Sequence, residues 1–415
     1  MTTPLSSITE PSRTLPVSAS YDVVVVGGGI AGIAAALAAV RAGVSVCLLE
    51  RYCALGGLAT IGNVITYLPL CDGRGRQVIG GISEELLRVS IQDTKRHDAH
   101  AHFDVFPECW APGGDPERRL HHRFQADFNP DAAILSYEEL LVKAGVALWY
   151  DTRFAAVARE GGRIAHVIVE NKSGRSAIAC RAVVDASGDA DVCAAAGERT
   201  ESLDTNVASG WFYTLTNGGD FRLRYLSRKF SEDATRNGAE GPFYRGDVAT
   251  DVTAQILDAR QMLRDALARL REESPDDDIQ PMHITTYPCF RMTRRLVGAE
   301  SLRRSDVHRW RDDAVCLAND WRRAGPVWAV PFSTLVGVEN DNLTVCGRCM
   351  SSDSTVWDAT RVIPVCGVTG EAAGLACAMA IRGNGGSVNT LAPRDVADAM
   401  RERGNLLSPE LVAEA

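Results

Sequence analysis

Residues 21–51, "YDVVVVGGGIAGIAAALAAVRAGVSVCLLER", decide the fold class. The β-branched run Val23–Val26 is typical of a parallel strand that is buried on both faces. Small apolar residues then continue at helical spacing to about Arg41, and a second apolar strand, Val44–Leu49, ends in Glu50. The order of strand, glycine loop, helix and strand predicts a βαβ unit.

The glycine loop between the first strand and the helix has the spacing of a dinucleotide-binding fingerprint. Gly27 permits the tight turn, Gly29 lets the backbone approach a diphosphate, and Gly32 lets the helix pack closely against the strand. At the start of the helix, Ile30 and Ala31 present free N–H groups and the positive end of the helix dipole to the phosphates. Such a loop alone would be weak evidence, but its position between a strand and a helix makes a dinucleotide site the better interpretation.

An acidic residue ends the second strand. Glu50 comes 18 residues after Gly32, where its carboxylate can accept hydrogen bonds from both hydroxyls of an adenosine ribose. A carboxylate at this place disfavours a 2′-phosphate, so FAD or NAD fits better than NADP. The neighbouring Arg51 is expected to lie against the same cofactor.

The bulk composition excludes several classes of function. The chain has 415 residues, and its net charge of −9 counts against a general DNA- or RNA-binding surface. Twelve cysteines without framework spacing indicate reduced thiols in a cytoplasmic protein. Residues 1–17 are rich in Ser, Thr and Pro and predict a flexible lead-in rather than a signal peptide. Residues 23–40 carry no charge, but their glycines favour a turn over a membrane span.

Three further stretches distinguish FAD from NAD. One is "RYCALGGLAT" (51–60), which contains Gly56, Gly57, Ala59 and Thr60. The second is "ACRAVVDASGDADVCAAAG" (179–197), a strand followed by Ser187, Gly188 and Asp189. The third, at 341–380, orders a strand, a polar loop and a helix rich in Gly and Ala.

Together these stretches carry a family resemblance. The segments "DVVVVGGGIAG", "LGGLAT", "GGISEEL", "DASGDADV", "NLTVCGRC" and "RVIPVCGVTGEAAG" resemble the bacterial FAD-dependent oxidoreductases of the two-dinucleotide-binding-domain, glutathione-reductase-like flavoprotein group. The matches span most of the chain except about 200–280 and the last thirty residues. Ser187 replaces the usual Thr and keeps the hydroxyl. The resemblance implies that FAD lies across a parallel sheet with its isoalloxazine near the last long helix.

The resemblance also implies where the chain meets the flavin end of FAD. We expect a helix to begin near Val368–Gly370 and to aim its N–H groups at the ring, where reduction places negative charge. The glycines of that helix could alternatively serve only to pack the helix closely against the sheet. Arg348 stands where related flavoproteins carry an Asp that contacts the ribitol, so it either contacts the cofactor or braces the loop. The cofactor-binding residues implied for this end are Gly347, Arg348, Arg361, Val362, Thr369 and Gly370.

These motifs predict an α/β fold with a Rossmann-like FAD-binding domain, whose central parallel sheet carries a β-meander at 155–184, and a mixed α+β substrate or cap domain. The FAD-binding domain is expected to be discontinuous, from residues 18–65, 145–200 and 338–385. The cap is expected from residues 66–144 and 201–337, because they hold most aromatic residues, prolines and histidines. Residues 386–415 predict a helical tail.

The candidate catalytic residues follow from the resemblance and from side-chain chemistry. Arg291 and Arg294 belong to the motif "RMTRRLVG" and suit a substrate carboxylate, with a salt-bridged structural turn as the alternative. His283 and Tyr287 are the candidate bases.

A second candidate cluster, "DSTVWDATRVIP", precedes the flavin-facing helix. Trp357 is expected to wall the substrate site. Arg361 is expected to stabilise reduced flavin or an anionic substrate, with pairing to Asp358 as its alternative.

The pair Cys346–Cys349 raises the question of thiol redox chemistry. It follows a strand instead of starting a helix, the usual place for a reactive thiol, so we predict no redox role. No paired C-x-x-C, HExxH or clustered ligands are present in the sequence, so no metal site is expected.

We therefore predict an FAD-dependent dehydrogenase or oxidase that removes hydride from a small organic substrate to flavin N5. The chain has no second strand–GxGxxG–helix unit, so electrons are expected to pass to O₂ or a redox protein, or from transiently bound NAD(P)H. The alternatives are an FAD-dependent monooxygenase, and a flavoprotein that uses FAD structurally or modifies RNA. The sequence leaves the oligomeric state and the substrate open.

Overall fold

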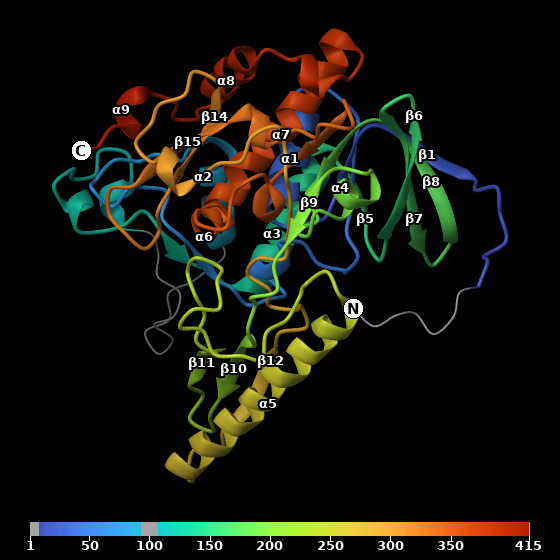
Figure 1. Cartoon of the computed structure of the whole chain (residues 1–415). Coiled ribbons are helices and arrows are strands. Elements are labelled where there is room, and N and C mark those ends of the chain that lie inside the picture. Colours follow the sequence, from blue (N-terminus) through green and yellow to red (C-terminus); the bar gives the residue numbers. More distant parts are fainter. Residues whose placement is uncertain (1–7, 93–106, 415) are drawn as a thin grey trace.

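The computed structural model describes residues 8–92 and 107–414. Residues 1–7 of the predicted lead-in, residues 93–106 of the predicted cap region and the last residue of the predicted tail lie outside this description. The described chain forms a large α/β body and an arm that projects from one end of it (Figure 1).

The body is built on a seven-stranded sheet with the order β5-β2-β1-β8-β7-β6, and β16 also pairs with β8. Its parallel part contains β1 (Val17–Val26), β2 (Val46–Leu49), β5 (Ala147–Trp149), the C-terminal half of β8 (Gly174–Asp185) and β16 (Leu343–Val345). The last four residues of β1 are almost fully buried, because helices or strands cover both faces of the sheet. All these strands end at the same edge.

A β-meander extends the sheet on its other side. β6 (Arg153–Glu160), β7 (Arg163–Asn171) and the first half of β8 pair antiparallel. The turn between β6 and β7 has two glycines with positive φ, Gly161 at 55° and Gly162 at 83°. The structure thus confirms the predicted fold class, a Rossmann-like α/β domain with a β-meander.

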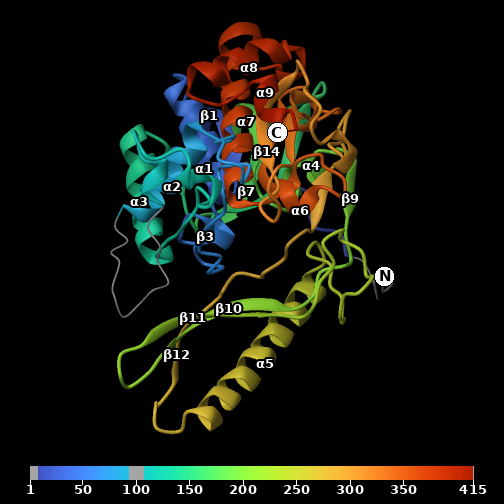
Figure 2. The same ribbon diagram turned by 90° about the vertical axis from the view of Figure 1, so that its left-hand side faces the viewer.

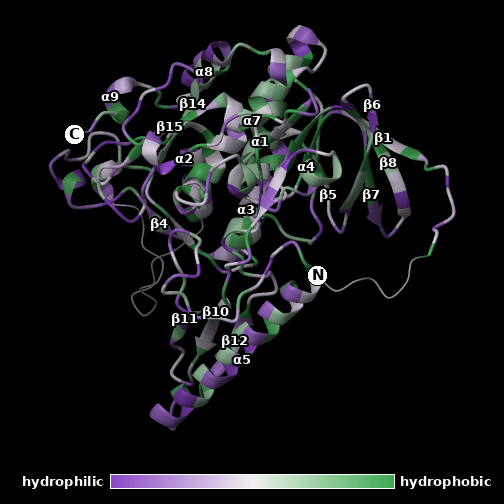
Figure 3. Ribbon diagram, in the orientation of Figure 1, coloured by the Kyte–Doolittle hydropathy of each residue, from purple (hydrophilic) through white to green (hydrophobic). Residues whose placement is uncertain are grey.

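Two helices form the centre of the body. α1 (Ile30–Arg41) packs against α7 (Ile363–Asn384) at very short range. A Cβ on Gly370 would lie 2.2 Å from the carbonyl oxygen of Ala31, and one on Gly374 would lie 2.0 Å from that of Ala35. Only glycine fits at both positions. Figure 3 shows the concentration of apolar residues in α1. By length and composition α7 could cross a membrane, but 83% of its apolar window is buried inside the protein.

Several segments that we expected in the cap belong to the body instead. α2 (Gly81–Ile91) and α3 (Pro130–Ala144) pack on each other and on α1, and β14 (Ala314–Asn319) pairs with β15 (Val327–Pro331) beside α7. Their buried residues join the main hydrophobic core. The boundaries 66–144 and 201–337 therefore overstate the cap, because aromatic and proline content does not show which core a segment joins. In the tail, α8 (Pro393–Glu402) packs on β14 and α7.

The part of the predicted cap region that stays apart from the body is the projecting arm (Figure 2). It consists of the sheet β11-β10-β12 and the long helix α5 that lies along one face of it. The bounds are β10 Ser209–Leu215, β11 Phe221–Ser227, β12 Gln280–Ile284 and α5 Ala249–Glu273. The remaining short elements are β3 Thr66–Tyr67, β4 Ala126–Asp127, β9 Thr200–Ser202, β13 Arg294–Leu296, α4 Asp191–Ala195, α6 Trp357–Thr360 and α9 Pro409–Val412.

Candidate functional site

A long groove lies at the carboxyl edge of the parallel strands and encloses about 1270 Å³, including the part that is open to solvent. The ends of β1, β2, β8 and β16 contribute to its floor, and the arm contributes one residue, Tyr287. Ligands of open α/β sheets bind at this edge. The sequence-predicted residues that line it are Gly27, Gly29, Ile30, Ala31, Glu50, Arg51, Gly56, Gly57, Ala59, Ser187, Gly188, Tyr287, Arg348 and Arg361.

The three fingerprint glycines have three different surroundings. Gly27 has φ 107°, and a Cβ there would lie 2.4 Å from the Ala186 carbonyl oxygen. A Cβ on Gly32 would lie 1.8 Å from the Gly27 carbonyl oxygen, so Gly32 lets α1 begin tightly against the turn and lies behind the groove. At Gly29 a Cβ would meet nothing within 4 Å. The backbone of Gly29 therefore faces open space in the groove.

The N-terminus of α1 opens into that space. Gly29 is its N-cap residue, and no side chain caps the helix. The first N–H groups of the helix, at Ile30 and Ala31, thus remain for an outside acceptor. A helix end of this kind binds phosphate oxygens.

Glu50 is fixed at the end of β2. Its Oε2 accepts a hydrogen bond from the Gly28 N–H at 2.7 Å, and its Oε1 accepts one from the Tyr52 N–H at 2.9 Å. Burial raises the pKa of this carboxyl, although both backbone hydrogen bonds oppose the rise. Because each carboxylate oxygen has a second lone pair, Glu50 can still accept hydrogen bonds from a ligand in the groove.

Arg51 and Tyr287 close the groove near Glu50. The Arg51 guanidinium donates a hydrogen bond to the Tyr287 hydroxyl at 3.2 Å and lies 5.3 Å from the centroid of its ring. This contact joins the β2 end of the body to the arm. Tyr287 therefore lies in the groove, whereas His283, the other candidate base, lies on β12 against Tyr213 and does not line it.

The loop after β2 forms another wall. Gly56 and Gly57 both have positive φ, 97° and 57°, and the Gly56 N–H donates to the Gly28 carbonyl oxygen at 2.8 Å. Thr60 is fully buried, and its hydroxyl donates to the Leu55 carbonyl oxygen at 2.5 Å. Thr60 thus fixes the shape of the loop from behind and does not face the groove.

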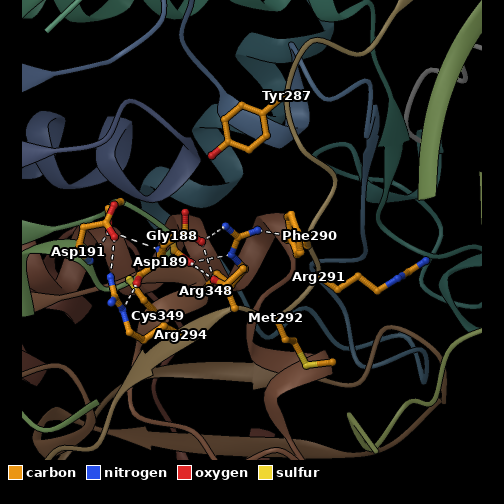
Figure 4. A network of polar contacts seen from close by, with 12 residues as sticks. Gly188, Asp189, Asp191, Tyr287, Phe290, Arg291, Met292, Arg294, Arg348 and Cys349 are labelled. Atoms are coloured by element: carbon orange, nitrogen blue, oxygen red, sulfur yellow. Dashed lines mark hydrogen bonds and ion pairs between the residues drawn. The ribbon is translucent and has the colours of Figure 1, made fainter. Parts of the chain in front are cut away.

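Arg348 connects three parts of the chain at the end of β16 (Figure 4). Its guanidinium donates to the Gly188 carbonyl oxygen at 2.7 Å, to Asp189 Oδ1 at 2.7 Å and to the Phe290 carbonyl oxygen at 2.6 Å. Arg348 therefore braces the loop after β8, and it also lines the groove. The loop-bracing alternative thus describes Arg348, and contact with the cofactor stays a prediction that its place in the groove permits. Asp189 points into the brace and is not among the residues that line the groove.

Arg294 belongs to the same network rather than to a substrate site (Figure 4). It donates to the Asp189 carbonyl oxygen at 2.8 Å and pairs with Asp191 at 2.7 Å. Asp191 lines the groove, and burial, together with the neighbouring Asp189 and Asp185, raises its pKa to about 6. The salt-bridged alternative thus describes Arg294.

Arg291 points away from that network in Figure 4. Its guanidinium contacts the Tyr225 hydroxyl and lies 3.6 Å from the centroid of the Phe230 ring. Burial lowers the pKa of Arg291, and the charge of Arg361 lowers it further. Arg291 does not line the groove.

Arg361 does line the groove, and its Nε donates to Asp358 at 2.9 Å. The pairing with Asp358 and a place in the groove therefore occur together. Trp357 is fully buried, and its indole N–H donates to the Arg348 carbonyl oxygen at 2.6 Å. Trp357 supports Arg348 from behind, so the expectation that it walls a substrate site was wrong.

The start of α7 also corrects the sequence-based expectation. The helix begins at Ile363, after a buried Val362, so Val368–Gly370 lie inside it. Its first turn, through Ile363 and Cys366, lines the groove.

Thr369 and Gly370 have packing roles behind that turn. The Thr369 hydroxyl accepts the Gly347 N–H at 3.1 Å, and Gly370 faces α1. Gly347 itself needs to be glycine because its φ is 69° and a Cβ would lie 2.8 Å from that of Ala31.

Further groove residues escaped the sequence analysis. Thr152, between β5 and β6, donates its N–H to the Glu50 carbonyl oxygen at 3.0 Å. The sequence held a signal for this residue, because the segment that follows a parallel strand starts at the carboxyl edge of the sheet, where ligands bind. The missed lining residues are Val26, Leu49, Leu58, Thr152, Arg153, Phe154, Ala186, Asp191, Cys346, Ile363 and Cys366.

The groove fits FAD on its own geometry. It offers open space at Gly29, an uncapped helix end for a diphosphate, a carboxylate at Glu50 for a ribose, and a second helix start at Ile363. These features line one continuous groove.

A family model described as FAD dependent oxidoreductase matches residues 22–206 and 213–400. No curated protein matches the chain.

Solved structures that resemble this chain do so at low sequence identity. A geranylgeranyl bacteriochlorophyll reductase-like protein from Thermoplasma acidophilum is 14% identical, with 95% of each chain covered and a TM-score of 0.44. The p-nitrophenol 4-monooxygenase PnpA from Pseudomonas putida DLL-E4 is 13% identical, with 93% of this chain and 85% of that chain covered and a TM-score of 0.45. Aklavinone-11 hydroxylase, solved with FAD and aklavinone, is 14% identical, with 88% of this chain and 63% of that chain covered and a TM-score of 0.49.

Proposed function

This chain belongs to the family of FAD-dependent oxidoreductases, and we propose that it is a dehydrogenase or oxidase that removes hydride from a small organic substrate. The observation that carries the proposal is the continuous groove from Glu50 past Gly29 to the first turn of α7. Bound FAD would supply the redox chemistry, because its N5 accepts a hydride from a substrate carbon held over the ring.

The chain's own residues would hold and orient the reactants. Glu50 accepts hydrogen bonds from the ribose, and the N–H groups of Ile30 and Ala31 bind the diphosphate. The positive end of α7 favours the negative charge that reduction places on the ring. Arg361, at the same end of the groove, attracts an anionic group. Tyr287, held by Arg51, closes the groove near Glu50.

We further propose that the chain is a bacterial, cytoplasmic member of the glutathione-reductase-like flavoprotein group. Support comes from the β-meander inserted before the last βα segment and from the arginine-rich composition. The twelve cysteines are all free, as is usual in a reducing compartment. The electron acceptor is proposed to be O₂ or a redox protein, since the sequence has no second dinucleotide fingerprint.

The test is reduction of the purified yellow protein by NADH or NADPH, with and without oxygen. We expect slow bleaching by either nucleotide and fast bleaching by the organic substrate. Fast bleaching by NADPH, followed by oxygenated intermediates when air is admitted, would instead indicate the monooxygenase alternative. A protein that neither contains nor binds FAD would contradict the proposal.

A further inference from the structure

One segment of the arm, residues 285–290, lies beside the cofactor groove and is anchored to the body at both ends. At its start, the Thr285 hydroxyl donates to the Ile61 carbonyl oxygen at 3.0 Å. At its end, the carbonyl oxygen of the buried Phe290 accepts a hydrogen bond from Arg348 at 2.6 Å. We call this segment the strap. Within the strap, only Tyr287 lines the groove.

The Tyr287 side chain contacts two side chains that follow β2. Arg51 donates to its hydroxyl at 3.2 Å, and the Arg51 guanidinium lies 5.3 Å from its ring centroid. The same guanidinium lies 5.2 Å from the centroid of Tyr52, and the two tyrosine ring centroids are 5.5 Å apart. Such hydrogen bonds and cation–π contacts are individually weak. Tyr287 can therefore leave Arg51 while the anchors of the strap at Thr285 and Phe290 stay in place.

The contact between Tyr287 and Arg51 lies at the ribose end of the groove. Arg51 and Tyr52 directly follow Glu50, and the Tyr52 N–H donates to the Glu50 carboxylate at 2.9 Å. Another wall of the groove comes from the loop after β8, through Gly188. Figure 4 shows the Tyr287 hydroxyl directed toward that loop. The contact thus closes the groove where Glu50 is placed to hold an adenosine ribose.

The surroundings of Tyr287 do not suit a catalytic base. Burial raises the pKa of its hydroxyl, and the positive charge of Arg51 opposes the rise only in part. The hydroxyl therefore keeps its proton at neutral pH and cannot take one from a substrate. As a neutral group it accepts the hydrogen bond from Arg51 instead.

We propose that the contact between Tyr287 and Arg51 is a latch that controls the exchange of FAD: the dinucleotide enters and leaves the groove while the latch is open and is retained while it is closed. The inference rests on the proposed function, since it takes FAD as the ligand of the groove. A latch slows entry and exit alike, so its removal raises both rate constants and leaves the dissociation constant nearly unchanged. Removal of a side chain that only contacts bound FAD raises the exit rate and the dissociation constant together.

The test is exchange of bound FAD in the holoprotein against an excess of radiolabelled FAD, together with the equilibrium dissociation constant for the full chain. We expect Tyr287→Ala to raise the exit rate about tenfold or more and to change the dissociation constant less than about threefold. Tyr52→Ala is the matched control. Tyr52 also contacts Arg51, but it does not line the groove, and its variant keeps the backbone N–H that Glu50 binds. Both values should then stay near those of the wild type.

Tyr287→Phe separates the latch from effects on folding, because it keeps the ring against Arg51 and loses only the hydrogen bond. It should raise the exit rate about threefold to tenfold at an unchanged thermal midpoint. The latch is overturned if neither Tyr287 variant speeds exit, or if the dissociation constant rises in proportion to the exit rate. A chain that binds no FAD, as seen in its absorbance spectrum, overturns the proposed function and the latch together. A chain that binds FAD and exchanges it at the same rate in all variants overturns the latch alone.

Discussion

Arg348 Nη2 lies 2.7 Å from Asp189 Oδ1, and both side chains are largely buried. The pair joins the end of β16 to the loop after β8, and Thr293 of the arm donates to the same carboxylate oxygen. The two body segments that carry the cofactor motifs are thus fixed to each other and to the base of the arm. Arg348 is therefore a structural centre of the site as well as part of its wall.

Replacing Arg348 by Met should destabilise the protein strongly. It leaves the Asp189 carboxylate buried without its cation, which costs about 3–5 kcal/mol. Urea unfolding should show this loss together with weaker retention of FAD. Arg236→Met is the control, because its ion pair with Asp204 is exposed, and it should cost no more than about 1 kcal/mol. Equal losses in the free energy of unfolding for the two variants would show that the buried ion pair contributes no more than the exposed one.

Gly374→Ala should separate α1 from α7. The new Cβ would lie 2.0 Å from the Ala35 carbonyl oxygen, so one helix must move. We expect a loss of about 2–4 kcal/mol in the free energy of unfolding, in the range of other overpacked cores.

The same helix offers an internal control. A Cβ on Gly383 meets nothing within 4 Å. Gly383→Ala should leave the stability unchanged or raise it by about 0.5–1 kcal/mol, because alanine favours the helix. A harmless Gly374→Ala would contradict the close packing of the two helices.

Glu371 makes stability depend on pH. It is fully buried on α7, where its Oε2 accepts the Ile82 N–H at 2.8 Å and its Oε1 has no partner. Burial raises its pKa to about 7. The folded protein thus holds this proton more tightly than the unfolded chain, so the stabilisation is complete at low pH and is lost as the pH rises through 7.

Glu371→Gln should remove that dependence. Between about pH 5 and 8 the wild type should lose roughly 3 kcal/mol relative to the Gln variant. Thermal midpoints measured at several pH values test this, with Glu402→Gln on the exposed side of α8 as the control. Parallel curves for wild type and Glu371→Gln would refute the assignment.

Cys346→Ser should leave flavin reduction unchanged. Cys346 and Cys349 are both fully buried, and burial raises the pKa of each thiol well above its usual value. Neither thiol is therefore expected to ionise to the reactive thiolate. Dithionite reduction followed by thiol counting should give the same number of electrons per protein for both forms. A loss of two electrons in the variant would restore the redox reading of this pair.

The sequence predicted the parts of the fold that depend on local order. The βαβ unit of residues 21–51 and the meander appear where the pattern placed them, because strand runs, turn glycines and helix spacing are local signals. The core of the body was harder to predict. α2 and α3 join it through contacts with α1, and no local pattern shows which core a helix will pack on.

The residues of the site, too, could be predicted only in part from the sequence. Glycine spacing located Gly29 and Glu50, but it did not separate residues that face the groove from those behind it. Thr60, Gly370 and Trp357 support the groove from behind, because their orientation follows from packing at long range. Arg291 and Arg294 share a motif, yet they point to different neighbours: Arg291 lies in a bend, whereas Arg294 begins the strand β13.

The central claim is that the groove binds FAD, and Gly29→Val tests it most directly. Gly29 has φ −70°, and a Cβ there meets no atom within 4 Å, so valine should leave the fold and the thermal midpoint nearly unchanged. Its side chain would occupy the approach to the diphosphate. The measurement is FAD content per protein after purification and after incubation with added FAD. The account predicts about one FAD per wild-type chain and at least a hundredfold weaker binding by Gly29→Val. A wild-type protein that does not bind FAD, or a Gly29→Val variant that binds it equally well, would contradict it.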